Sequence, residues 1–135
     1  MKSSGPEPRR LRHFSCPVYG FQKIVSGKYK LRILWDLREG PRRYGDIRQG
    51  LLTGSAGSKN VTPRVLSREL KTLTTLGMIE RKDFGTVPPR VEYALTAEGR
   101  SLVPVLSVMH TWGVHHLVRE ELVKQLVVRH EPDAE

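Results

Sequence analysis

The segment from Asn60 to Gly77, NVTPRVLSRELKTLTTLG, has the pattern on which the predicted fold of this chain depends. The hydroxyl of Thr62 can cap a helix, and Pro63 suits the first helical position, where a missing N–H costs nothing. Gly77 suits the helix end, because glycine readily takes the left-handed conformation found there. These residues predict one helix that begins sharply after Thr62 and stops at Gly77.

The two faces of this predicted helix differ in chemistry. One face is aliphatic: Val65, Leu66, Leu70, Leu73 and Leu76. The opposite face carries cations and hydroxyls: Arg64, Ser67, Arg68, Lys71 and Thr75. A core can hold such a helix while its outer face presents donors to phosphates and base edges, as a DNA recognition helix does. An ordinary surface helix with a solvated charged face shows the same pattern, so the neighbouring sequence must decide.

The composition indicates a small basic domain with a polyanionic partner. The chain has 135 residues, and 23 lysines and arginines against 14 acidic residues give a formal net charge of +9. Nucleic acid is favoured over a membrane, because no apolar run approaches the ~20 residues of a spanning helix and no apolar signal core follows the basic N-terminus. A single cysteine cannot form an internal disulfide. We therefore expect a cytoplasmic protein, associated with the nucleoid through DNA.

The N-terminal part of the chain is expected to hold a basic arm and a first helix. Residues 1–14 are polar and basic, so they form either a flexible arm that tracks phosphates or a minor groove, or a disordered tail. Pro17 then opens a helix with apolar residues at helical spacing: Val18, Phe21, Ile24 and Val25. Cys16 lies at the positive end of this helix, which favours a reactive thiolate. Free cysteine also behaves as a small buried hydrophobe, so both roles stay open.

Two more helices are predicted before the segment at 60–77. The second covers about 28–38 and turns apolar residues toward a core: Leu31, Leu34, Trp35 and Leu37. Its other side is expected to be cationic: Lys28, Lys30, Arg32 and Arg38. The third covers about 44–51, and Arg42 and Arg43 precede it, where they could contact the DNA backbone. Residues 52–60 are rich in glycine and serine and are expected to form a loop.

After Gly77 the apolar period changes from helical to alternating. The segments at 78–84, MIERKDF, and 90–96, RVEYALT, read as two antiparallel strands joined by a turn. A hairpin directly behind a recognition-type helix indicates a winged helix-turn-helix, in which the hairpin tip lies against the DNA backbone or in the minor groove. The candidate contacts near that tip are Arg81, Lys82 and Arg90.

Together these segments resemble the HxlR-type regulators, relatives of the MarR-type winged-helix proteins. The similarity covers Cys16 to Gly113, and its most specific parts are Cys16-Pro17, Gly27-Lys28, LSRELKTL at 66–73 and VPPRVEYALT at 87–96. The resemblance implies a mainly α fold with a small β-hairpin and a dimeric bacterial or archaeal transcription regulator. It also implies that Cys16 is a candidate sensor, because it aligns with the cysteine of redox- or electrophile-sensing members. The basic arm and the extra residues at 54–59 depart from the family pattern.

The C-terminal third suggests a dimer interface. Thr96 can cap a helix with an apolar stripe: Leu102, Val105, Leu106, Met109 and Trp112. More apolar residues continue beyond Gly113, and a two-fold partner could bury them, although packing of the tail on its own domain competes. Pro104 should start or kink this helix. We divide the chain into an arm at 1–14, a winged helix-turn-helix domain at 15–113, a dimerisation helix at 114–130 and a frayed acidic tail at 131–135.

The predicted function is sequence-specific binding of double-stranded DNA by a homodimer on an inverted-repeat operator. The candidate DNA-binding residues are Thr62, Arg64, Ser67, Arg68, Lys71, Arg43, Lys82 and Arg90. Among them Arg64, Ser67 and Arg68 are the candidates for base edges. Oxidation or alkylation of Cys16 is the candidate switch, and the effector would be a small electrophile, an oxidant or a noncovalent ligand.

Other functions have less support in the sequence. No nucleophile, base and orienting group stand together and no phosphate-binding glycine motif is present, so no enzyme is expected. His110, His115 and His116 have no cysteine or carboxylate at ligand spacing, so neither a metal nor another cofactor is expected. A winged helix used for protein or RNA contact is the remaining alternative.

Overall fold

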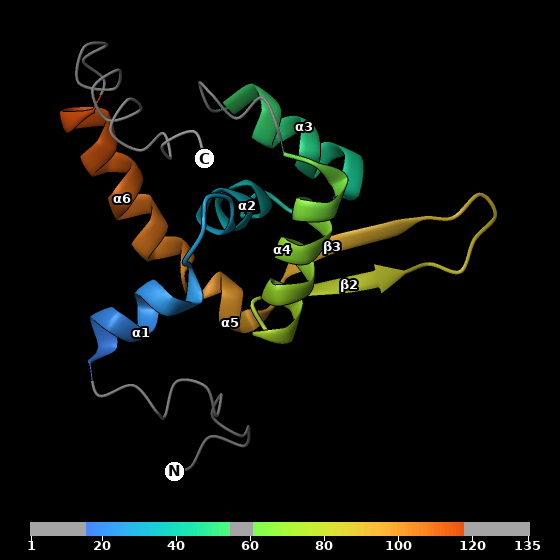
Figure 1. The fold of residues 1–135 in the computed structure, drawn as a ribbon, viewed down its shortest axis with the longest axis horizontal. Coiled ribbons are helices and arrows are strands. Elements are labelled where there is room, and N and C mark those ends of the chain that lie inside the picture. Colours follow the sequence, from blue (N-terminus) through green and yellow to red (C-terminus); the bar gives the residue numbers. More distant parts are fainter. Residues whose placement is uncertain (1–15, 55–60, 118–135) are drawn as a thin grey trace, which may run out of the picture.

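The computed structural model describes residues 16–54 and 61–117, which form a helical domain with a small sheet (Figure 1). The elements in chain order are α1 (Pro17–Ile24), α2 (Lys30–Leu37), β1 (Arg42–Arg43), α3 (Tyr44–Gly54), α4 (Pro63–Thr75), β2 (Ile79–Asp83), β3 (Val91–Leu95), α5 (Ala97–Arg100) and α6 (Val103–His116). The predicted basic arm, most of the glycine- and serine-rich loop, the greater part of the dimerisation helix at 114–130 and the acidic tail lie outside the described residues.

The sheet has three strands rather than the two that the sequence predicted. Its order is β1-β3-β2, with both pairs antiparallel. The hairpin of β2 and β3 is confirmed, and Ile79 pairs with Leu95 near its base. The additional strand consists of Arg42 and Arg43, which the sequence placed just before the third helix. These residues pair with Tyr93 and Glu92, so β1 covers backbone groups that would otherwise remain open along β3.

The core forms where α2, α3 and α4 meet the base of the hairpin. The predicted leucine stripe is confirmed, since Leu66, Leu70 and Leu73 of α4 are at most 1% exposed. Ile33, Leu34 and Leu37 contribute the fully buried face of α2. At the end of α4, Gly77 has a φ of +77°, as a left-handed helix stop requires.

Two details of α2 differ from the prediction. Leu31 and Trp35, expected in the core, are only half-buried. They line a pocket beside α6, together with Met109 of that helix. Lys30, expected on a cationic outer side, is buried with 8% exposure. The reason is a carboxylate on another helix: Glu69 of α4 pairs with Lys30, and a paired charge can be buried where an isolated one cannot.

The C-terminal region contains two helices where the sequence suggested one. Thr96 does cap a helix, but that helix is the short α5, with the Gly99 N–H donating to the Thr96 hydroxyl at 3.0 Å. The longer helix α6 starts separately at Val103 and has Pro104 in its first turn. This start follows from the chemistry of proline, which lacks an N–H and is tolerated in a first turn but not in a helix interior.

None of the helices within 16–54 and 61–117 combines the length and apolar character needed to cross a bilayer.

Candidate nucleic-acid interface

Helix α4 presents its cationic face to solvent. Its first turn is held by the predicted cap, because the Val65 N–H donates to the Thr62 hydroxyl at 3.2 Å. The predicted DNA-binding residues on its outer side are all exposed: Arg64, Ser67, Arg68 and Lys71. Within the part of the chain that the structure describes, none of these three cations has an ion-pair partner. Their charge is therefore free to neutralise phosphates.

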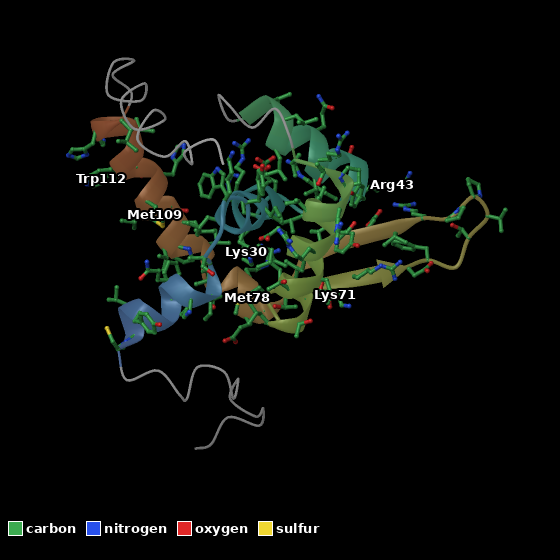
Figure 2. All side chains as sticks on the ribbon, in the orientation of Figure 1. Lys30, Arg43, Lys71, Met78, Met109 and Trp112 are labelled. Carbon is green, nitrogen blue, oxygen red and sulfur yellow. The ribbon has the colours of Figure 1, made fainter. Side chains whose placement is uncertain are left out.

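A second contact fixes the leading end of α4. The hydroxyl of Tyr44, at the start of α3, donates to the Pro63 carbonyl at 3.2 Å. The first turns of α3 and α4 therefore lie together, and Arg43 stands exposed immediately before α3. In Figure 2, Arg43 and Lys71 both lie on the half of the molecule from which the hairpin extends. The structure thus brings the predicted phosphate contacts of β1 and α4 to one side.

The hairpin forms a wing whose cations surround an aromatic ring. Every residue from Glu80 to Arg90 is exposed. The Lys82 ammonium lies 4.9 Å and the Arg90 guanidinium 4.7 Å from the centre of the Phe84 ring. Both distances are within the range of cation–π interactions, which hold long side chains in place. The ring therefore keeps the two predicted wing contacts together near the tip.

One of these wing cations already has a partner. The Arg90 guanidinium contacts a carboxylate oxygen of Glu92 at 2.6 Å through one terminal nitrogen and at 2.9 Å through Nε. Glu92 also lies directly opposite Lys82 in the β2–β3 register. The Arg90–Glu92 pair has a local signal that sequence reasoning missed, since residues two positions apart in a strand share a face. The placement of Lys82 opposite Glu92 depends on the strand register and has no such signal. The Glu92 carboxylate reduces the positive charge that the wing offers to DNA.

Cys16 occupies the position that the sequence predicted, at the start of the first helix. It is exposed and not in a disulfide. It is the N-cap residue of α1, and Pro17 follows within the first turn. The Cys16 carbonyl accepts a hydrogen bond from the Gly20 N–H at 2.9 Å, whereas its side chain makes no capping bond. A thiol that is exposed at a helix start is accessible to reagents in solution, and the described residues of one subunit do not bury it.

On the other side of the molecule, α6 has a largely uncovered apolar face. Of the predicted stripe only Leu106 is buried, so packing within residues 16–54 and 61–117 covers only part of it. The exposed large apolar residues of α6 are Val105, Val108, Met109, Trp112 and Val114. Figure 2 shows Met109 and Trp112 along α6, away from Arg43 and Lys71. Two exposed residues of α1, Val18 and Tyr19, add to the uncovered apolar surface.

Two of the three histidines of α6 serve as stacking partners. His110 stacks on Trp35 with ring centres 5.0 Å apart, and His116 stacks on Trp112 at 4.5 Å. Among the described residues no group of three histidines, cysteines or carboxylates stands close enough to hold a metal ion.

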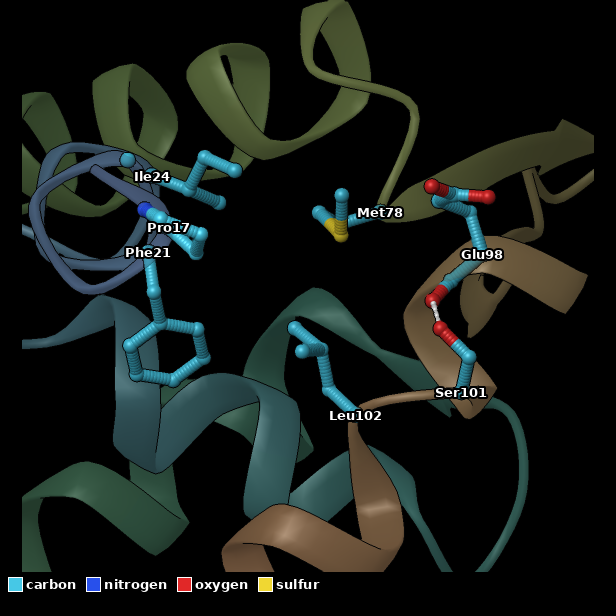
Figure 3. Close-up of a pocket in the computed structure, with 8 residues that line it drawn as sticks. Pro17, Phe21, Ile24, Met78, Glu98, Ser101 and Leu102 are labelled. Atoms are coloured by element: carbon cyan, nitrogen blue, oxygen red, sulfur yellow. Dashed lines mark hydrogen bonds between the residues drawn. The ribbon is translucent and has the colours of Figure 1, made fainter. Parts of the chain in front are cut away.

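A cavity of about 310 Å³ lies between α1 and the segment of α5 and Leu102 that precedes α6. Figure 3 shows apolar side chains around it, among them Phe21 and Ile24 from α1 and Met78 from the turn before β2. Glu98 of α5 and the neighbouring Ser101 supply its polar groups. Sequence reasoning missed this cavity, because its lining comes from three segments whose residues are far apart along the chain.

These features define a winged helix-turn-helix DNA-binding protein: a capped helix with free cations outward, followed by a wing. The HxlR-like helix-turn-helix profile matches residues 24–121, and the chain belongs to this family. It is 35% identical over 105 residues to MalR of Fusobacterium mortiferum, whose name describes it as regulatory, covering 77% of this chain and 92% of MalR. It is 31% identical over 110 residues to YkvN of Bacillus subtilis, an uncharacterised HTH-type transcriptional regulator, covering 82% of this chain and 87% of YkvN.

Solved structures show the same relationship. The redox regulator HypR in its reduced form superposes with a TM-score of 0.68 at 29% identity, covering 78% of this chain and 98% of HypR. Its oxidised form gives a TM-score of 0.65 at 31% identity, covering 75% and 97%. The chain is thus a DNA-binding transcriptional regulator and not an enzyme, as the sequence predicted.

Proposed function

We propose that this regulator acts as a homodimer that inserts one α4 helix from each subunit into successive major grooves of an inverted-repeat operator. The observation that carries this proposal is that two surfaces of different chemistry lie on opposite sides of the molecule. Free cations of α4 lie on one side, and the uncovered apolar face of α6 lies on the other. A two-fold partner on α6 would bury that apolar face and leave both copies of α4 open to DNA. Since its target is the chromosome, we place the protein at the nucleoid in the cytoplasm.

The residues have different roles in this proposal. Arg64, Ser67 and Arg68 are the base-reading candidates, because they are exposed on the leading half of α4. Lys71 and Arg43 contact phosphates, together with the wing cations. Thr62 contributes mainly by capping α4, since its hydroxyl already accepts the Val65 N–H.

Selection of bound fragments from the source genome tests this proposal. The purified chain is mixed with sheared genomic DNA at moderate salt, and the bound fragments are sequenced. We expect a short inverted repeat with half-site centres about one helical turn apart. A bound pool without any shared sequence, or a shared site without two-fold symmetry, would contradict the proposal.

For the switch, we propose that Cys16 reacts with a quinone or a peroxide. With a quinone, the thiolate sulfur attacks an electron-poor ring carbon, and an S–C bond forms as the ring C=C π bond opens. The displaced electron pair takes up a proton at a quinone oxygen, and the attacked carbon loses its ring proton to solvent, which leaves a hydroquinone thioether. With hydrogen peroxide, the thiolate attacks one oxygen and the O–O bond breaks. Sulfenic acid forms, and the hydroxide that leaves takes a proton from solvent to become water. The exposed thiol and the likeness to a redox regulator support this proposal. Because α1 borders the proposed dimer side, modification there could change the separation of the two α4 helices.

Operator affinity of the wild type and of Cys16→Ser, each with and without a quinone, tests the switch. We expect the quinone to change the affinity of the wild type and to leave the serine variant unchanged. Equal responses of the two proteins would show that Cys16 is not the sensor.

A second mode of regulation is supported by the cavity between α1 and α5. Its volume and its apolar lining suit a small noncovalent ligand, which would act in place of a thiol reagent. Phe21→Ala should abolish a ligand response that Cys16→Ser leaves intact. A function in binding only a protein or an RNA is less favoured than DNA binding. Competition between DNA of mixed sequence and a structured RNA for the purified chain distinguishes DNA binding from RNA binding.

A further inference from the structure

A buried ion pair joins three segments behind the DNA-facing side of α4. The Lys30 ammonium lies 2.6 Å from Glu69 Oε2, and each side chain is only 10% exposed. The same ammonium donates to the Ser26 carbonyl at 3.0 Å. Ser26 lies two residues beyond the end of α1, Lys30 begins α2 and Glu69 lies in the middle of α4. One side chain therefore connects the end of α1, the start of α2 and the recognition helix.

The backbone at Gly27 lies within contact distance of this pair. Gly27 has a φ of +108°, a conformation that side chains rarely adopt. A Cβ placed on Gly27 would lie 3.4 Å from the Lys30 ammonium and 3.7 Å from the Glu69 carboxylate. The loop between α1 and α2 therefore packs directly on the pair and helps to exclude water from it.

Glu69 provides a directional contact on a helix side that is otherwise apolar. The remaining buried side chains of α4 are Leu66, Leu70 and Leu73, and their burial is non-directional. A charge-assisted hydrogen bond has a preferred geometry, so it restricts rotation and sliding of the helix. Ser67 and Lys71 are each two residues from Glu69, or about 200° around the helix axis. A rotation that this bond prevents would redirect the residues that face DNA.

A buried ion pair is weak evidence for a role in stability. Replacement of a buried ion pair by apolar side chains of similar size often leaves the stability of a protein unchanged or raises it. Loss of one partner is strongly destabilising, because the remaining charge is buried without water or a counter-ion. We propose that Lys30 and Glu69 are positioning residues, which set the rotation of α4 for operator recognition and couple it to the end of α1. This inference rests on the proposed function, since it requires an operator.

The double variant K30M/E69M tests the proposal. It keeps the net charge and replaces both groups by flexible apolar chains, so affinity for mixed DNA should stay unchanged. We expect an unfolding midpoint in urea close to that of the wild type, and a ratio of operator to mixed-DNA affinity that falls by about tenfold or more. A folded double variant with the wild-type ratio would overturn the proposal, because restored stability would then be sufficient for recognition.

A matched control comes from α2, the helix that contains Lys30. The R32M/D36M variant also preserves the net charge, and its pair, 2.9 Å apart, lies within α2. Arg32 also donates to the Gly50 carbonyl of α3, so its loss costs stability without a contact to α4. We expect this variant to keep the wild-type ratio, and an equal fall of the ratio in both double variants would count against a specific role of Lys30 and Glu69.

A milder substitution covers the case in which K30M/E69M does not fold. Glu69→Gln keeps the shape of the side chain and one acceptor oxygen but removes the charge. We expect a folded protein with a ratio reduced by roughly threefold, since part of the hydrogen bond remains. An unchanged ratio for Glu69→Gln would refute the proposal. A wild-type protein that prefers no genomic fragment would instead refute the proposed function.

Discussion

At the scale of single residues, Arg68 and Lys71 offer the clearest contrast. Both are exposed cations on α4. Arg68 is a candidate for a base edge, and Arg68→Ala should weaken operator binding by about 1–3 kcal/mol while affinity for mixed DNA changes much less. Lys71→Ala should weaken binding to all sequences and lower the slope of log affinity against log salt by about 1. Titrations with operator and mixed DNA at several salt concentrations measure both effects. Uniform losses for Arg68→Ala would contradict base reading.

A second residue-scale prediction concerns Gly99 of α5. A Cβ on this buried glycine would collide with the Met78 carbonyl oxygen. Gly99→Ala should therefore destabilise the domain by about 1–3 kcal/mol through overpacking, measured as the free energy of unfolding in urea. Gly45→Ala is the matched control, because Gly45 lies in helix α3 with no atom within 4 Å of an added Cβ. The control should be neutral or slightly stabilising. Equal effects of the two changes would show that α5 can move away from Met78.

At the scale of elements, an acidic residue reduces the positive charge that the wing offers to DNA. Glu92 pairs with Arg90 and faces Lys82. Glu92→Gln should release Arg90 for phosphates, raise the affinity for all DNA sequences and steepen its salt dependence. Glu80→Gln makes the same charge change on an exposed β2 residue, and we expect a smaller increase. If the two variants bind DNA equally well, the Arg90–Glu92 pair does not restrain the wing.

The elements also show what the sequence could predict. The leucine stripe of α4 and the alternation in β2 and β3 are local patterns, and the sequence therefore predicted these elements with nearly correct ends. Strand β1 has two residues and no pattern of its own, because it exists through pairing with β3. Likewise, burial of Lys30 depends on Glu69, 39 positions further along the chain. Contacts of this kind arise from the tertiary structure and leave no periodic signal.

At the scale of the whole molecule, the proposed dimer depends on the apolar face of α6. A charge there should prevent burial against a second copy, and Met109→Glu should therefore yield monomers in analytical ultracentrifugation. Operator affinity should fall far more than affinity for a single half-site, because two linked reading heads bind with a high effective concentration. Ser107→Glu lies about 200° around the helix from Met109 and should remain dimeric. Dimers of Met109→Glu would place the interface elsewhere.

The two tryptophans of the chain provide an optical signal for this assembly. Trp35 is enclosed between the Arg38 guanidinium, 3.7 Å from its ring centre, and His110. Trp112 is 55% exposed and lies on the uncovered face of α6. Burial of Trp112 in a subunit contact would shift its fluorescence to shorter wavelength, whereas the emission of Trp35 would stay nearly constant. In a Trp35→Phe background, the spectrum recorded during serial dilution would therefore report subunit dissociation without any attached dye.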